Sequence, residues 1–158
     1  MYLISIIYTY ARGGRAISVS IITPNIIQED LKILNSFSNN INKIRSFMDN
    51  QQLNEYVKFI VDKSFDANKY FNDEAPWNKK DDKKRLNTIV YVSLEIIRKI
   101  SILLLTIIPY SANKALVSLN LSTKTLKLSS INDHLINKPG TKITNQGILF
   151  KKIEKNND

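Results

Sequence analysis

The sequence from residue 53 to residue 77 reads LNEYVKFIVDKSFDANKYFNDEAPW, and its spacing predicts a long amphipathic helix that stops before a Pro-Trp pair. Small or apolar side chains recur every three or four residues and would form one stripe on such a helix; they are Leu53, Val57, Ile60, Ser64, Ala67 and Phe71. The opposite face would carry Glu55, Lys58, Asp62, Lys63, Asp66 and Lys69. Pro76 lacks a backbone N–H and disfavours helix at the preceding residue. We therefore expect the helix to end near Phe71 or Asn72.

Further helices are expected on both sides of this segment. Upstream, a helix begins near Gln28, kinks at residues 39–40, and presents Leu31, Leu34, Phe37, Ile41 and Ile44 on one face. Asp49 and Gln52 have the spacing of a capping box for the helix that follows. Downstream, residues 85–107 form the most apolar helix, which would be buried on several sides, and Pro109 ends it. A short helix capped by Ser111 would follow and end at Leu119.

These elements predict an all-α fold, namely a bundle of four or five helices with an irregular C-terminal segment. The chain has 158 residues, of which 43% are apolar, and this suits one domain with its own core. We place that domain at residues 28–154, before a charged tail at 155–158. The sequence does not decide the secondary structure of residues 1–27. Residues 1–12 fit either a short helix or a strand, and residues 17–22 alternate like a strand.

The composition limits the classes of function. A net charge of +9 favours a polyanionic partner such as a nucleic acid, although a merely basic domain would show the same excess. The chain has no cysteine and one histidine, His134, so we expect no metal site. The longest apolar run, residues 100–108, is too short to span a bilayer, and the first residues lack the basic region of a signal peptide. We expect a cytoplasmic protein with no membrane partner.

The single tryptophan, Trp77, is the residue with the most specific chemistry. An indole at a helix end and beside lysines can stack on an unpaired base, since every base offers a π face. The simpler interpretation is that Trp77 fills a gap between two helices, and residue type alone favours that interpretation. Lys79 and Lys80 follow the tryptophan and are candidate phosphate contacts, as are Arg12 and Arg15 around the Gly13-Gly14 break.

The order of several motifs resembles the anticodon-binding domain of bacterial methionyl-tRNA synthetases, which are class I enzymes. That family shows an Ala-Asn-x-Tyr-(Ile/Val)-(Asp/Asn)-x-x-x-Pro-Trp segment, then a Tyr-x-x-Leu-Glu-x-(Ile/Leu)-Arg helix and a Pro-x-(Ser/Thr)-Ala turn. Here the matching stretches are residues 67–77, 91–98 and 109–112, with further likeness at residues 28–31, 139–140 and 148–154. The resemblance covers roughly residues 28–154, and the synthetases for leucine, isoleucine and valine share the same helical scaffold.

The resemblance implies roles for two residues. In the family, the tryptophan that matches Trp77 stacks on an anticodon base, and the proline that matches Pro76 helps to hold it. The family also reads anticodon base edges with an Asn-x-x-x-Arg pair on an earlier helix. That pair is not evident here, because Tyr8 precedes Arg12 by four positions and Ala11 precedes Arg15. The departure puts the selection of the methionine anticodon in doubt.

Catalytic motifs of this class of enzyme are absent from the sequence. There is no His-Ile-Gly-His-like or Lys-Met-Ser-Lys-Ser-like segment, no P-loop and no Gly-x-Gly-x-x-Gly. We therefore expect no catalytic residue and no cofactor in this chain, since ATP and methionine would need a catalytic domain. The leading hypothesis is a split or truncated tRNA-binding module that does not aminoacylate alone. The alternatives are one piece of a two-chain synthetase, a remnant that binds nothing, and a protein-interaction bundle.

Overall fold

The computed structural model describes residues 25–134, 136 and 143–144. Within them the chain forms five α-helices, three short 3-10 helices and no strand, which confirms the all-α prediction. The α-helices are α2 (Gln28–Ser38), α3 (Ile41–Asp49), α4 (Leu53–Glu74), α5 (Lys83–Leu104) and α6 (Pro109–Ser118). The 3-10 helices are η1 (Pro76–Asn78), η2 (Thr123–Thr125) and η3 (Leu128–Ile131).

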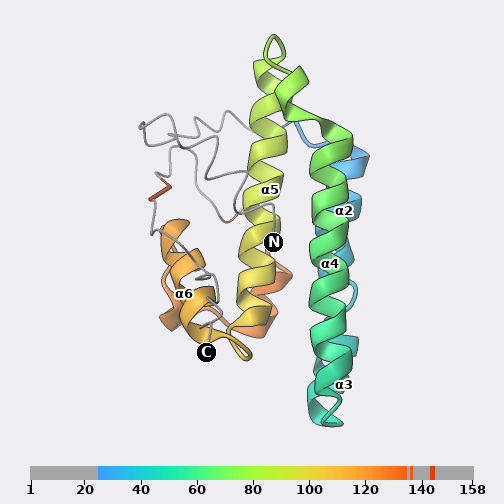
Figure 1. Ribbon diagram of the computed structural model, residues 1–158, viewed down its shortest axis with the longest axis vertical. Helices are drawn as coiled ribbons and strands as arrows, with labels where there is room; N and C mark the ends of the chain where they lie inside the picture. Colours follow the sequence, from blue (N-terminus) through green and yellow to red (C-terminus); the bar gives the residue numbers. More distant parts are fainter. Residues whose placement is uncertain (1–24, 135, 137–142, 145–158) are drawn as a thin grey trace, which may run out of the picture.

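Helix α5 is the centre of the bundle, as its apolar sequence predicts. It contacts α2, α4, α6 and η3, and every residue from 91 to 99 is buried. Helices α4 and α5 lie side by side in opposite directions, with α2 and α3 behind α4 (Figure 1). The loop that carries η1 joins α4 to α5 at one end of the molecule, while α6 lies beside the opposite half of α5 (Figure 1).

The buried face of α4 differs from the predicted stripe. Ile60, Ala67 and Phe71 are buried as expected, but Leu53 and Val57 are 51% and 37% exposed. Their places in the core are taken by Tyr56, Phe59 and Tyr70. The tyrosines can be buried because their hydroxyls donate hydrogen bonds, from Tyr56 to the Leu103 carbonyl over 2.7 Å and from Tyr70 to Asp30 Oδ1 over 2.6 Å. The same kind of shift occurs in α2, where Leu31 is exposed and Ile33 is buried.

The predicted helix ends also need correction. Asp49 is the last residue of α3 and does not cap α4, which begins at Leu53 after Gln52, a residue with no capping side-chain bond. Helix α4 continues to Glu74 rather than ending near Phe71. Helix α6 begins at Pro109, two residues before the predicted cap Ser111, because proline fits the first helical position, where its missing N–H is not needed.

Two buried cations of α5 hold the segment that follows α6. Arg98 donates from Nη1 to the Ser130 carbonyl over 2.8 Å and from Nη2 to the Asp133 carbonyl over 2.6 Å. Lys99 donates to the carbonyls of Ile131 and Asp133. Arg98 also pairs with Glu95 at 3.0 Å, and all three side chains are inaccessible to solvent. The family-like helix motif at residues 91–98 therefore fixes an otherwise irregular segment. The predicted turn at residues 139–140 and the patch at 148–154 lie outside the described residues.

No helix in the described ranges is long and apolar enough to cross a membrane. The same residues contain no cluster of three or more potential metal ligands.

Candidate nucleic-acid interface

Trp77 lies on η1, at the end of the molecule where α4 turns into α5 (Figure 1). Its side chain is 42% exposed, whereas the adjacent Pro76 is buried. The indole packs against the buried ring of Phe71, with the ring centroids 6.2 Å apart and the planes at 57°. A tilted aromatic pair at this distance is a favourable arrangement that restricts the indole. Trp77 is thus both partly packed and partly open to a ligand.

The backbone before Trp77 makes an unusual turn at Ala75. This residue ends α4 in the left-handed conformation, with φ at 42° and ψ at 61°. Its N–H donates to the carbonyls of Phe71 and Asn72, which closes the last turn of the helix. Pro76 then starts η1, since its fixed φ suits a helical first position. The turn ends α4 and leads into η1, where the indole of Trp77 contacts Phe71 near the end of α4.

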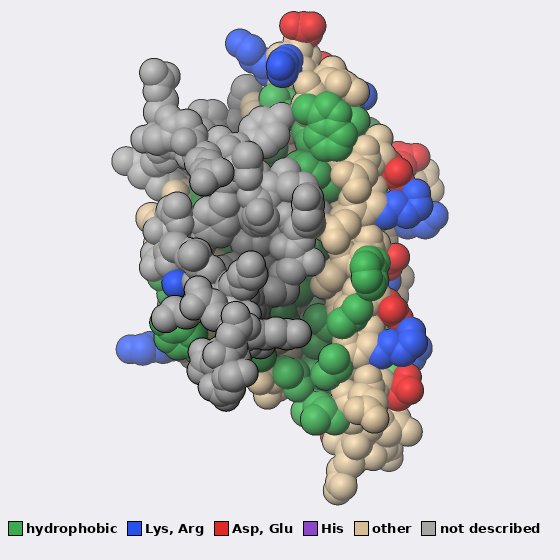
Figure 2. All heavy atoms as spheres, in the orientation of Figure 1, with side chains coloured by type: hydrophobic (Ala, Val, Ile, Leu, Met, Phe, Trp, Pro, Cys, Tyr) green, Lys and Arg blue, Asp and Glu red, His purple; other side chains and the backbone are tan. Residues whose placement is uncertain are grey.

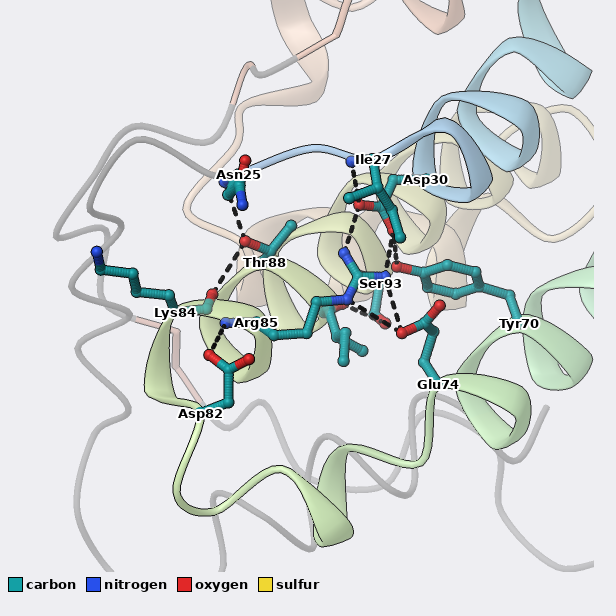
Figure 3. A network of polar contacts seen from close by, with 11 residues as sticks. Asn25, Ile27, Asp30, Tyr70, Glu74, Asp82, Lys84, Arg85, Thr88 and Ser93 are labelled. Carbon is teal, nitrogen blue, oxygen red and sulfur yellow. Dashed lines mark hydrogen bonds and ion pairs between the residues drawn. The ribbon is translucent and has the colours of Figure 1, made fainter.

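A polar network lies beside this loop and joins three helices (Figure 3). Arg85 of α5 contacts Asp30 of α2 and Glu74 of α4, at 2.7 Å and 2.8 Å respectively. The hydroxyl of Tyr70 donates to Asp30 Oδ1, and the N–H of Ile27 donates to Asp30 Oδ2 over 3.0 Å. Asp30 is fully buried, so each of its carboxylate oxygens needs such partners.

The charges of the network are stabilised by their neighbours. Burial alone would raise the pKa of Asp30, but hydrogen bonds from Arg85, Tyr70 and the Ile27 N–H, with the charge of Arg85, hold it below its usual value. Burial and the bond to Asp30 raise the pKa of Tyr70 far above its usual value. Asp30 is therefore an anion and Tyr70 a donor at neutral pH.

Four lysines surround the loop, at positions 79, 80, 83 and 84. Lys79 is half-buried and the other three are exposed. None of them forms an ion pair within the part of the chain that the structure describes. By contrast, the lysines of α4 are paired with carboxylates one turn away, as Lys58 is with Asp62 and Lys69 with Asp73. Among the described residues, the lysines at 79, 80, 83 and 84 are therefore cations available to a phosphate backbone at this end of the molecule.

The charged side chains of α4 are arranged differently from the lysines of residues 79–84, as Figure 2 shows. Acidic and basic side chains alternate along one edge of the helix, and hydrophobic side chains run beside them (Figure 2). The exposed apolar residues of α4 recur every fourth position; they are Leu53, Val57, Val61 and Phe65. This exposed stripe is a second surface of the molecule, distinct from the tryptophan loop.

The structure brings together four of the six site residues predicted from the sequence. Trp77, Pro76, Lys79 and Lys80 lie on one loop, while Arg12 and Arg15 fall outside the described residues. Sequence reasoning did not include Lys83 and Lys84 as candidate contacts, although both belong to the same charged run. It also missed Arg85, whose partner Asp30 is 55 positions away and which no local pattern indicates.

Comparison with known proteins identifies the family. A family model described as the anticodon binding domain of methionyl tRNA ligase matches residues 23–158. The chain belongs to this family. The methionine–tRNA ligase of Rickettsia conorii is 34% identical over 140 residues, which cover 86% of this chain and 27% of that protein. The Thermotoga maritima ligase is 34% identical over 113 residues, covering 68% of this chain and 17% of that protein. The chain thus spans about a quarter of the length of the first relative and less of the second.

Solved structures support the fold of this anticodon-binding domain. The apo form of Mycobacterium tuberculosis methionyl-tRNA synthetase superposes with a TM-score of 0.76 at 23% identity, covering 88% of this chain and 31% of that one. The same synthetase in complex with methionyl-adenylate gives 0.74 at 24% identity, covering 82% of this chain and 26% of that one. The likeness confirms the predicted helix-bundle architecture.

Proposed function

We propose that this chain binds a methionine-accepting tRNA through the loop between α4 and α5, with Trp77 stacking on an unpaired anticodon base. The observation that carries the proposal is that Trp77 is 42% exposed while its ring packs against Phe71. A ring that is held in place loses little freedom when a base stacks on it. Lys79, Lys80 and their neighbours at 83 and 84 supply positive charge for the phosphates beside that base.

In this function the chain binds tRNA and carries no catalytic residue. ATP and methionine would be bound elsewhere, in a catalytic domain that this sequence does not contain. Binding should rest on stacking and on phosphate contacts, and selection of the methionine anticodon should be weak if the family's Asn/Arg reading pair is missing. Arg12 and Arg15 are further candidate phosphate contacts.

The test is titration of the full chain with an anticodon stem-loop. Trp77→Ala should weaken binding by the stacking energy of one base, about 1–3 kcal/mol, or about 5- to 150-fold in Kd. The matched control is Tyr110→Ala, because Tyr110 is 79% exposed at the start of α6, near the far end of α5. Unchanged affinity of the Trp77 variant, or an equal loss in the Tyr110 variant, would contradict the proposal.

The lysines should contribute differently from the tryptophan. Replacing Lys79 and Lys80 together by Gln should weaken binding and reduce the salt dependence of Kd, because fewer counterions are released. Trp77→Ala should leave that salt dependence unchanged. Titrations between about 50 mM and 200 mM salt separate the two effects. Identical salt slopes for the double lysine variant and the original chain would rule out these two lysines as phosphate contacts.

A second candidate function is docking of a separate synthetase catalytic chain, and the exposed stripe on α4 favours it. Phe65 is 67% exposed and Leu53 is 51% exposed, at the two ends of this row of residues four positions apart. Apolar patches of this kind commonly mark protein contacts. If this chain restores charging to a methionine–tRNA ligase fragment that lacks its own anticodon-binding part, Phe65→Lys should abolish the rescue while Trp77 fluorescence stays unchanged. Rescue that is unaffected by Phe65→Lys would exclude this stripe as the docking face.

A further inference from the structure

Among the residues that the structure describes, the loop at residues 75–82, which carries Trp77, has backbone hydrogen bonds only within itself and to the helix ends that it joins. Asn78 N donates to Ala75 O over 2.9 Å, Lys79 N to Pro76 O over 3.1 Å, and Asp82 N to Lys79 O over 3.1 Å. Each bond spans three residues, so these bonds shape the turn without attaching it to another helix. The direction in which the loop points therefore depends on how its two ends are fixed and on the packing of η1 against α5.

Arg85 is bonded to both ends of the loop. Its Nε donates to Glu74 Oε2 over 3.1 Å, and Glu74 is the last residue of α4. Its backbone N–H donates to Asp82 Oδ1 over 3.0 Å, and Asp82 is the residue that caps α5. The side chain of Arg85 thus holds the end of α4, while its backbone N–H, which any residue at this position would supply, holds the residue that caps α5 (Figure 3).

The guanidinium is itself fixed by a buried carboxylate. Arg85 Nη1 donates to Asp30 Oδ2 over 2.7 Å and Nη2 donates to Asp30 Oδ1 over 3.0 Å. Two parallel bonds of this kind define an orientation as well as a distance. Because Tyr70 and the Ile27 N–H hold the same carboxylate, the position of Arg85 is set by α2 and α4 together.

We propose that Arg85 is a positioning residue for Trp77, which sets the direction in which the loop presents the indole to an unpaired base. This inference rests on the proposed function. In this proposal Arg85 is not an RNA contact, because its side chain is only 13% exposed and its Nε, Nη1 and Nη2 each donate to Asp30 or Glu74. A lysine at position 85 keeps the charge but lacks the planar fork, so it cannot hold both carboxylates in this geometry.

The variant that tests the inference is Arg85→Lys in the full chain, with Arg45→Lys on the exposed side of α3 as the matched control. The chain has one tryptophan, so its fluorescence reports on the loop alone. In the RNA-free protein, Arg85→Lys should lower the steady-state anisotropy of Trp77 and increase its quenching by acrylamide, while far-UV circular dichroism stays the same. Arg45→Lys should change none of these signals.

Binding measurements separate positioning from general stability. Arg85→Lys should weaken anticodon stem-loop binding by about 3- to 30-fold, which is part of the stacking energy. In a Trp77→Ala background the same change should alter Kd by less than about twofold, because the two residues act through one contact. Equal losses in both backgrounds would overturn the inference, and so would unchanged anisotropy and affinity in Arg85→Lys.

A second variant keeps the test decisive if Arg85→Lys unfolds the bundle. Glu74→Gln preserves the buried pair of Arg85 with Asp30 and weakens only the link to the end of α4. It should give the same fluorescence changes and a smaller loss of affinity, about 2- to 5-fold, since one charged hydrogen bond becomes a neutral one. An effect of Trp77→Ala without any effect of Glu74→Gln would contradict positioning but not the proposed function. A null result for Trp77→Ala would contradict the proposed function, while the fluorescence of the free variants would still decide the role of Arg85.

Discussion

Trp77 combines two arrangements that residue type alone presents as alternatives. Its ring packs on Phe71, as expected for a residue that fills a gap, and 42% of the side chain is nevertheless exposed. The exposed part lies on the loop of residues 75–82, which carries Lys79 and Lys80, and Lys83 and Lys84 follow at the start of α5. None of these four lysines has a carboxylate partner in the described residues. An indole that packs on Phe71, is partly exposed and lies near these lysines is suited to stacking on a base beside its phosphates.

Asp30 joins α2 to α4 and α5 beside the loop, through Tyr70 and Arg85. It is fully buried and pairs with Arg85, so Asp30→Asn would leave the arginine without its bidentate partner. Removing one member of a buried pair costs roughly 3–5 kcal/mol. Urea unfolding near neutral pH should show a loss of this order, whereas Asp62→Asn, at an exposed pair, should change the free energy of unfolding by less than about 1 kcal/mol.

Acid should weaken the protein through the same carboxylate. The pKa of Asp30 is lower in the folded chain than its ordinary value of 3.8. Its contribution to stability is therefore present above that ordinary value and is lost as the pH falls through the folded pKa. The urea midpoint of the original chain should fall more steeply below pH 4 than that of Asp30→Asn. Parallel pH curves for the two proteins would show that Asp30 is not the group responsible.

At the scale of the elements, the hydrophobic spacing predicts where helices lie better than how they are rotated. The helices near Gln28, before Pro76 and before Pro109 are all present. The predicted stripe of α4 is right at Ile60, Ala67 and Phe71 and wrong at Leu53 and Val57, which are exposed. Tyr56 and Tyr70 are buried in the core because their hydroxyls find partners on α5 and α2. A hydroxyl partner on another helix is a tertiary contact, and no pattern within one segment reveals it.

The left-handed end of α4 gives a prediction about the loop itself. Ala75 has a φ of 42°, a conformation that glycine adopts without the steric cost of a Cβ. Ala75→Gly should raise the free energy of unfolding by roughly 0.5–1 kcal/mol, while Ala75→Val should lower it. Urea unfolding measures both changes. A glycine variant that is less stable than the original chain would show that the cost lies in the unfolded state or elsewhere in the loop.

At the scale of the whole molecule, the candidate site depends on contacts between distant parts of the chain. The sequence predicts Trp77, Pro76 and the neighbouring lysines, because they form one local motif. It does not predict Arg85, because that side chain acts through Asp30 on another helix. Arg98 belongs to the motif at residues 91–98, but no local pattern predicts the carbonyls that Arg98 and Lys99 bind, since these lie more than 30 positions away.

Lys99 should make the stability of the bundle rise with pH over a defined interval. Burial, with repulsion from Arg98, lowers the pKa of Lys99 from 10.5 to about 8, although Glu95 and Asp133 act in the opposite direction. The folded state then releases this proton more readily than the unfolded state does, so the free energy of unfolding increases with pH above about 8. The gain should end near pH 10, where buried tyrosines such as Tyr70, whose pKa is raised, begin to disfavour folding.

The control for this pH dependence is Lys99→Met. The urea midpoint of the original chain should rise between about pH 7.5 and pH 9.5, and the increase should be smaller in the variant. The difference between the two slopes of urea midpoint against pH gives the effect of Lys99, separate from the general decrease in positive charge. Equal slopes would mean that Lys99 is as easily protonated in the folded chain as in the unfolded one.

The most direct test of the proposed tRNA contact is the fluorescence of Trp77 during titration with the anticodon stem-loop, since this is the only tryptophan in the chain. Stacking on a base should quench the emission, and the quenching should saturate at the same RNA concentration as binding measured by anisotropy of a labelled RNA. A stem-loop in which the anticodon bases are replaced by abasic positions should bind more weakly and leave the emission nearly unchanged. Saturable binding of the intact stem-loop with no change in Trp77 emission would contradict the account.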